Sequence, residues 1–354
     1  MRVGNTNSTA SILSKDETTS MRGIAIIFIV LHNLLHLLLP TVENEFTFKL
    51  ERSITFAKYA LEFNPSLWKD IFSFLGWYGV VVFLFLSGYG LTKKYGYTQE
   101  KPFNVGTFVW KHLKRVLLLM IIPYTLFVII KFKELETYRI LLQLTLTSNI
   151  FGPNGITPGV YWFFGLIAQF YILFAIIRYI KDVRYRSIIL LSISALSIIF
   201  MFCIPGDSAL INYIRHNCIG WLLPFSMGVW FAEQQSLDKL FNSLWKNVAW
   251  VIGCGLLVVI SNANYYTWCI SPIFAIMASI ALTKILSRCC WIDKGCIWFG
   301  ALSSFLFAVH PIVRCICLKY ITENMTRTLY ILGYLLASVA LALLYRAIHK
   351  RFLS

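Results

Sequence analysis

The chain of 354 residues is 58% hydrophobic and only 14% charged, with a mean hydropathy of +0.69. A soluble domain is typically about 45–50% apolar and about 25% charged, so this composition argues against a soluble enzyme, a disordered chain and a disulfide-rich secreted module. Lys and Arg number 32 against 16 Asp and Glu. Such an excess is typical either of nucleic-acid binding or of the cytoplasmic loops of a membrane protein.

Apolar stretches that are long enough to cross a bilayer recur along the whole chain. About 20 residues in a helix cross the hydrocarbon core of a membrane. The pattern predicts ten spans, several of them short or polar at one end: residues 23–39, 71–91, 116–130, 161–177, 188–204, 219–231, 249–261, 268–286, 296–317 and 329–345. The predicted fold class is therefore all-α, a polytopic integral membrane protein of about ten transmembrane helices.

Three segments lie outside these spans. Residues 1–20 are polar. The apolar run that follows them is too long for the core of a signal peptide and lacks a small-residue cleavage site, so we expect that this N-terminal part of the chain is not cleaved off. Residues 140–151 are too short to span and end in a Gly- and Pro-rich run, which favours an interfacial or re-entrant piece. The chain thus divides into a polar cytoplasmic segment (1–20), one transmembrane domain (21–347) and a short basic cytoplasmic tail (348–354).

The distribution of basic residues predicts the orientation of the spans. The N-terminus and every second loop carry 21 of the 32 Lys and Arg residues, and the loops on the opposite side carry 11. Cytoplasmic loops carry the excess of Lys and Arg, so both termini are predicted to be cytoplasmic. The basic excess is then explained by topology and by contact with membrane lipids, and no nucleic-acid partner is predicted.

Nine cysteines are scattered between Cys203 and Cys317. An odd number without CxxC pairs indicates neither a disulfide framework nor a zinc-ligand pattern. We expect these cysteines to act as small apolar residues within or near the helices, and we predict no metal site.

Ionisable residues at membrane depth are the first candidates for function, because each is costly unless it is paired or lines a cavity. All 16 acidic residues fall in loops or at the ends of predicted spans. Since ion-coupled transporters commonly use an intramembrane carboxylate, this absence counts against transport. The ionisable residues that do lie inside predicted spans are mainly histidines, namely His32, His36 and His310, and Arg314 lies near the outer end of the ninth span.

His32 and His36 share one face of the first predicted helix, because residues four apart are neighbours on a helix. His32 lies ten residues beyond Arg22, about 15 Å along the axis, and so near the middle of the bilayer. Burial disfavours the charged imidazole, so each ring is expected to be neutral and able to accept a proton. The alternative is that both are structural histidines with satisfied hydrogen bonds.

Six motifs resemble, in order, those of the acyltransferase 3 family of bacterial membrane O-acyltransferases. The first is a basic residue followed about three turns later by a histidine, here Arg22 and His32. The others are VFLFLSGY at 82–89, the basic block 111–115 with Pro-Tyr at 123–124, YWF at 161–163, LPFSMG at 223–228 and SSFLFAVHP at 303–311. The resemblance covers about residues 20 to 345.

This resemblance implies transfer of an acyl group, usually acetyl, from cytosolic acyl-CoA to a hydroxyl of a surface polysaccharide or its lipid-linked precursor. It implies a multi-pass protein of the bacterial inner membrane, with acyl-CoA as a co-substrate and no permanently bound cofactor. Arg22 and the block of Lys111, Lys114 and Arg115 are the expected contacts of the CoA phosphates. A histidine of the first helix is the expected base or acyl relay.

Two departures from the family pattern keep alternatives open. The family histidine usually lies eleven residues after the basic residue, whereas His32 lies at ten and His36 at fourteen, so either ring is a candidate. We favour His32 because it aligns with the motif and lies nearer mid-bilayer. Lys111 and Lys114 replace arginines that are common in the family, and a lysine lacks the bidentate phosphate contact of arginine.

Further motif residues have both a functional and a structural interpretation. Ser87 and Tyr89 belong either to a substrate site or, with Gly88, to a small-residue packing contact. Trp162 either stacks on a sugar or anchors the chain at the interface. His310 either faces substrate or bonds a carbonyl freed by Pro311. A transporter or flippase for a polysaccharide precursor or small metabolite is the alternative function.

Overall fold

The computed structural model describes residues 12–62, 65–95, 103–180, 182–319 and 328–352, and in these ranges every regular element is helical. The protein is an all-α polytopic membrane protein, as predicted. Its α-helices are α1 (Lys15–Leu35), α2 (Leu50–Leu61), α3 (Leu67–Leu75), α4 (Tyr78–Tyr95), α5 (Val105–Lys131), α6 (Thr137–Leu144), α7 (Ser148–Phe151), α8 (Trp162–Ile177), α9 (Val183–Phe202), α10 (Ala209–His216), α11 (Leu222–Glu233), α12 (Leu244–Ser261), α13 (Tyr265–Leu286), α14 (Cys290–Lys319) and α15 (Thr328–Phe352).

Eight helices of the described chain are long and apolar enough to cross a membrane: α1, α5, α8 with the turn before it, α9, α12, α13, α14 and α15. The predicted span 71–91 is instead two helices, α3 and α4, which meet at an angle of 49° and qualify only as a pair. The predicted span 219–231 corresponds to α11, whose 12 residues are fewer than the about 20 of a full crossing.

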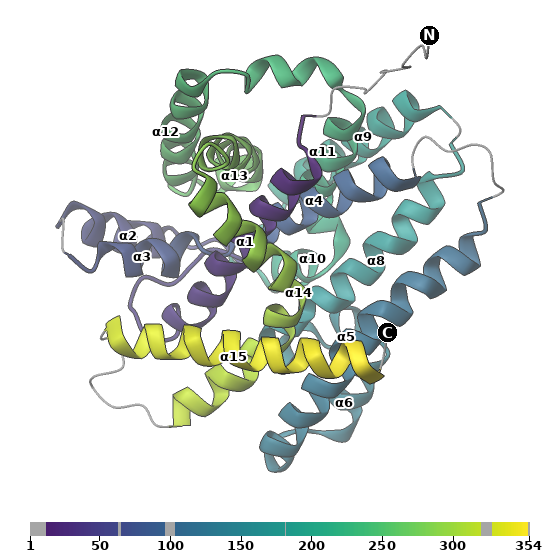
Figure 1. The fold of residues 1–354 in the computed structure, drawn as a ribbon, viewed down its shortest axis with the longest axis vertical. Helices are drawn as coiled ribbons and strands as arrows, with labels where there is room; N and C mark the ends of the chain where they lie inside the picture. The colour runs from purple at the N-terminus through teal and green to yellow at the C-terminus, as the bar shows by residue number, and fades with distance from the viewer. Residues whose placement is uncertain (1–11, 63–64, 96–102, 181, 320–327, 353–354) are drawn as a thin grey trace, which may run out of the picture.

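Helix α1 occupies the centre of the bundle, with α4, α13 and α14 packed around it (Figure 1). It begins at Lys15, eight residues before the predicted span. The Ser14 side chain and Glu17 form a capping box that starts the helix there. The Glu17 carboxylate also forms a salt bridge of 2.9 Å with Lys284 of α13, so the first turn of α1 is held on two sides.

The break between α3 and α4 follows from close packing at Gly76. A Cβ atom at Gly76 would lie 2.5 Å from Cβ of His32 and 2.9 Å from the carbonyl oxygen of Phe28. Only a glycine lets α3 end so near α1. The bend therefore places the C-terminal end of α3 against the last turns of α1.

The remaining segments are short helices or extensions of spans. Residues 140–151, predicted as an interfacial or re-entrant piece, form part of α6 and the single turn α7. At the other end of the chain, α15 continues to Phe352, so His349, Lys350 and Arg351 of the predicted basic tail lie in its last turn.

The orientation of the bundle remains a prediction from the charge distribution. Reporter fusions after Lys94, Arg186 and Lys350 are expected to give a cytoplasmic signal, and fusions near Glu51 and Asn324 an external one, because basic residues concentrate in cytoplasmic loops. Asn324 lies outside the described residues. A cytoplasmic signal at Asn324 would contradict the ten-span arrangement.

Candidate active site

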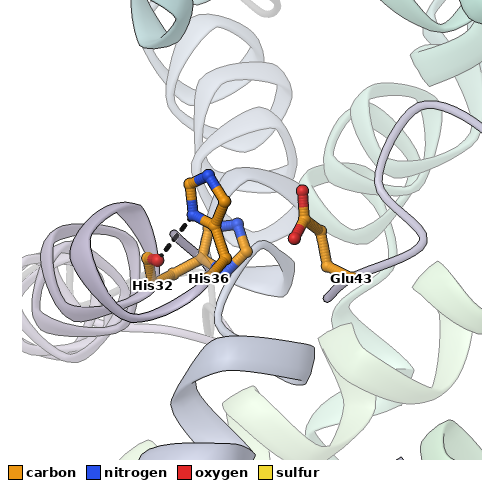
Figure 2. A group of neighbouring side chains, drawn as sticks. All are labelled: His32, His36 and Glu43. Atoms are coloured by element: carbon orange, nitrogen blue, oxygen red, sulfur yellow. Dashed lines mark hydrogen bonds between the residues drawn. The ribbon is translucent and has the colours of Figure 1, made fainter. Parts of the chain in front are cut away.

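Three buried side chains meet at the C-terminal end of α1. His32 lies in the last turn of α1, His36 caps the helix, and Glu43 comes from the loop that leads to α2. A ring nitrogen of each histidine and a carboxylate oxygen of Glu43 lie within 4.8 Å of one another. Figure 2 shows the Glu43 carboxylate facing the two imidazole rings. We call these residues the His–His–Glu cluster.

Backbone carbonyls determine which nitrogen of each ring carries the proton. Nδ1 of His32 lies 2.9 Å from the carbonyl oxygen of Ser73, and Nδ1 of His36 lies 2.7 Å from that of His32. A carbonyl oxygen can only accept, so each Nδ1 is the donor. In a neutral ring Nε2 is then an unprotonated acceptor. The two rings stack with centroids 4.8 Å apart.

Helix α3 ends at the bend near Gly76, and this leaves the backbone carbonyl of Ser73 available to His32. Ser73 lies in the last turn of α3, where carbonyl groups have no partner within the helix. The Ser73 hydroxyl in turn donates to the carbonyl of Thr41, with a distance of 2.7 Å. The Thr41 hydroxyl donates to Asp70 at 2.9 Å. Helix α3 thus positions both the His32 ring and the start of the loop that carries Glu43.

Glu43 is the member of the cluster that the sequence did not predict. It lies in a loop, as expected of an acidic residue, but the loop folds back into the bundle. Its Oε2 atom is buried and has no hydrogen-bond partner among the described residues. Burial raises the pKa of Glu43, whereas a protonated His32 or His36, its own backbone amide and Arg52 lower it, and the net shift is below the usual value. The cluster therefore contains a carboxylate.

A buried arginine holds the same loop against the bundle. Arg215 of α10 donates from Nε to the carbonyl of Glu45 at 3.0 Å, and Trp268 donates from Nε1 to the carbonyl of Asn44 at 2.7 Å. The Arg215 guanidinium lies 3.9 Å from the ring centroid of Trp221 and 4.8 Å from that of Trp268. Burial lowers the pKa of Arg215 to about 10, so the side chain stays charged at neutral pH.

An outer cavity of about 270 Å³ opens beside the cluster at the C-terminal end of α1. Its polar lining includes His36, Glu43 and Glu45, and it also includes the predicted residue Trp162. Only 4% of Trp162 is exposed, because it packs on Phe46 and Trp221. Burial and the neighbouring Glu43 raise the pKa of Glu45 well above its usual value, which favours the protonated carboxyl.

An inner cavity of about 270 Å³ lies at the opposite end of α1. The predicted residue Arg22 lines it together with Lys15, Lys93 and Tyr89. The phenolic hydroxyl of Tyr89 bonds both the amide and the carbonyl of Leu13 at 3.2 Å, so Tyr89 also fixes the chain that precedes α1. Three basic side chains therefore surround one cavity.

The structure separates the predicted basic block from this cavity. Lys111, Lys114 and Arg115 are exposed on α5 and are not among the residues that line the inner cavity. Arg115 and Arg22 nevertheless both interact electrostatically with the hydroxyl of Tyr171 on α8. The block is a neighbour of the inner cavity and not part of its wall.

Two further predicted residues lie away from the cluster. Ser87 donates to the carbonyl of Phe83 in its own helix, beside Gly88, where a Cβ would lie 2.2 Å from the carbonyl oxygen of Phe225. His310 is fully buried and bonds the carbonyl of Leu306 at 3.1 Å. Neither Ser87 nor His310 lines the inner or the outer cavity.

Comparison with known proteins gives one match. A family model described as an acyltransferase domain matches residues 19–347. This range includes the His–His–Glu cluster and, apart from Leu13, Ser14, Lys15 and Thr18, the lining of both cavities. No curated protein and no solved structure matches the chain.

Proposed function

The chain belongs to the acyltransferase domain family matched over residues 19–347, and from this premise we propose that it is a membrane O-acyltransferase of the bacterial inner membrane. The acyl group, expected to be acetyl, moves from cytosolic acyl-CoA to a hydroxyl of a surface polysaccharide or lipid-linked sugar. The observation that carries this proposal is that the His–His–Glu cluster borders a cavity at one end of α1, while a cavity with three basic side chains lies at the other end. The buried Glu43 carboxylate is a feature that ion-coupled transporters also have, and it is the family match that favours an acyltransferase over this alternative.

The inner cavity is proposed to receive the donor. Its walls carry Lys15, Arg22 and Lys93, and cationic groups bind phosphates through charge-assisted hydrogen bonds. Arg22 precedes His32 by ten residues, or about 15 Å along the helix. The acyl-pantetheine arm of the bound donor would extend over this distance toward the cluster.

The outer cavity is proposed to receive the acceptor. Trp162, Phe46 and His216 give it aromatic walls, and Glu45 and Arg314 add polar groups. Aromatic faces combined with hydrogen-bonding groups suit a sugar, whose ring has apolar faces and a polar edge. Arg314 is held in place by donating to the carbonyl of Asn33 at 3.0 Å.

The proposed reaction uses the unprotonated Nε2 of His32. Nε2 takes the proton of the acceptor hydroxyl, the oxygen attacks the thioester carbonyl, and the CoA thiolate leaves and takes the proton back from the imidazolium. The Glu43 carboxylate stabilises the imidazolium, as an acidic residue does in a catalytic triad. In a second route Nε2 attacks the thioester and the CoA thiolate leaves; the acceptor hydroxyl then attacks the acyl group on Nε2, its proton goes to the thiolate, and the neutral imidazole is restored.

Donor binding is expected to depend on the inner cavity. Arg22→Gln combined with Lys93→Gln should weaken acyl-CoA binding at least about 100-fold, because each charge-assisted contact contributes about 1.5–3 kcal/mol. Lys114→Gln combined with Arg115→Gln should have a smaller effect, about 10-fold, because these residues lie outside the cavity wall. The measurement is binding of labelled acyl-CoA to the purified protein in detergent.

Arg351→Gln, in the last turn of α15, is the matched control and should bind as wild type does. Unchanged affinity in the Arg22/Lys93 double variant would remove the inner cavity from the donor site. Unchanged affinity in the Lys114/Arg115 double variant would remove the α5 block. The acceptor is then tested by mass spectrometry of surface glycans from cells with and without the gene.

A further inference from the structure

The donor atoms of the His–His–Glu cluster match those of a three-ligand metal site. We propose that His32, His36 and Glu43 bind a divalent transition metal ion such as Zn²⁺, and that the bound ion inhibits acyl transfer by occupying Nε2 of His32. The inhibitory part rests on the proposed function, whereas the binding part does not. Imidazole nitrogen and carboxylate oxygen are ligands that Zn²⁺ prefers.

The three ligand atoms could bind one metal ion if they moved slightly closer together. The three ligand atoms lie within 4.8 Å of one another. Around a tetrahedral Zn²⁺ with bonds of about 2.0–2.2 Å, ligand atoms lie about 3.3–3.5 Å apart. The two histidines are held by one helix, and Glu43 lies on a loop. The widest separation must therefore shorten by about 1.3–1.5 Å, through rotation of the Glu43 side chain and tilting of the two imidazole rings, which stack with centroids 4.8 Å apart.

The hydrogen bonds around the cluster are compatible with a metal site. Ligand histidines usually donate their second ring nitrogen to a carbonyl or carboxylate, which orients the ring. Here the carbonyls of Ser73 and His32 accept from the two Nδ1 atoms, at 2.9 and 2.7 Å. Both Nε2 atoms are therefore unprotonated without rearrangement. The buried Oε2 of Glu43, which has no hydrogen-bond partner among the described residues, supplies the third ligand.

The outer cavity gives an ion access to the cluster. His36 and Glu43 both line it, so an ion can reach them from the C-terminal end of α1. The fourth position would hold water. Arg314 lines the same cavity and interacts electrostatically with His36. Its positive charge opposes a bound cation, so we expect weaker binding than at a structural zinc site.

Metal binding is tested on the full-length protein, purified in detergent through a histidine-free tag. Titration with Co²⁺ should produce the visible absorption of a four-coordinate ion, and Zn²⁺ should displace it. His36→Ala and Glu43→Gln should each weaken Co²⁺ binding at least 10-fold, because each removes one of three ligands. His216→Ala, a histidine of the same cavity outside the cluster, should bind as wild type does.

Inhibition is tested separately by acyl transfer. Zn²⁺ should inhibit the wild-type protein, a chelator should restore activity, and Mg²⁺ should have no effect because it prefers oxygen ligands. The residual turnover of His36→Ala should be insensitive to Zn²⁺ at concentrations that inhibit wild type.

The outcomes separate the two proposals. Absence of a Co²⁺ spectrum, or an equal affinity in wild type, His36→Ala and Glu43→Gln, would overturn the metal site whether or not the protein transfers acyl groups. A Co²⁺ spectrum that depends on His36 and Glu43 in a protein without acyl transfer would leave the metal site standing and overturn the proposed function. Full acyl transfer by the Zn²⁺-loaded protein would overturn the inhibition.

Discussion

His32→Ala is expected to lower acyl transfer by about 10²–10⁴-fold, the usual contribution of a general acid–base group. The ring lies in the last turn of α1, one turn before His36 of the outer cavity, and its Nδ1 donates to the Ser73 carbonyl. Alanine removes the only atom proposed to take the hydroxyl proton. The amount of folded protein should change little, because the substitution removes about one hydrogen bond.

His36→Ala is expected to lower acyl transfer only about 10-fold, since this ring lines the outer cavity and orients the acceptor or the His32 ring. Transfer is measured in membranes and normalised to inserted protein, with His349→Ala as the histidine control. Full activity in His32→Ala with none in His36→Ala would reverse the two roles. Full activity in both would end the proposal that a histidine of the first helix catalyses the reaction.

Glu43→Gln is expected to lower acyl transfer about 100-fold. The amide keeps the size of the side chain but cannot stabilise the imidazolium that forms when His32 takes a proton. Because the pKa of Glu43 lies below its usual value, the wild-type carboxyl is ionised at neutral pH. It loses its charge only at a pH below the usual range for a glutamate, so this group should not limit activity near neutrality.

Two further variants serve as comparisons for Glu43→Gln: Glu43→Asp, which keeps the charge, and Glu51→Gln, which is the control. Aspartate keeps the charge on a shorter side chain, so Glu43→Asp should transfer faster than Glu43→Gln. Glu51 lies exposed at the start of α2, and Glu51→Gln should behave as wild type. Wild-type transfer by Glu43→Gln would show that the buried carboxylate has no part in the reaction.

Features that depend on neighbouring residues could be predicted from the sequence. The long apolar runs predicted the helices, since a membrane allows a spanning chain little besides helices. The spacing of four residues predicted that His32 and His36 share a face, because residues four positions apart in an α-helix lie about one turn apart on the same side. The order of short motifs predicted the family, which the match over residues 19–347 shows.

The composition of the site depends on contacts between distant parts of the chain. The loop with Glu43 is held at Asn44 by Trp268, 224 positions away, and at Glu45 by Arg215, 170 positions away. No local sequence pattern distinguishes such a loop from a loop in solvent. The sequence therefore predicted only that Glu43 is an acidic residue in a loop. The spacing of the cysteines bears only on zinc sites built from cysteine pairs and carries no information on the His–His–Glu cluster, whose third member this loop supplies.

Local sequence thus determined the helices, the membrane class and the shared face of the two histidines, because each arises from residues within a few positions of one another. Only the tertiary structure decided that the span 71–91 bends at Gly76, that Ser73 orients His32, and that Arg22 lines a cavity with Lys93. These results come from the close approach of backbones and side chains on separate helices. Such packing is set by the shapes of whole surfaces and leaves no periodic signal along the chain.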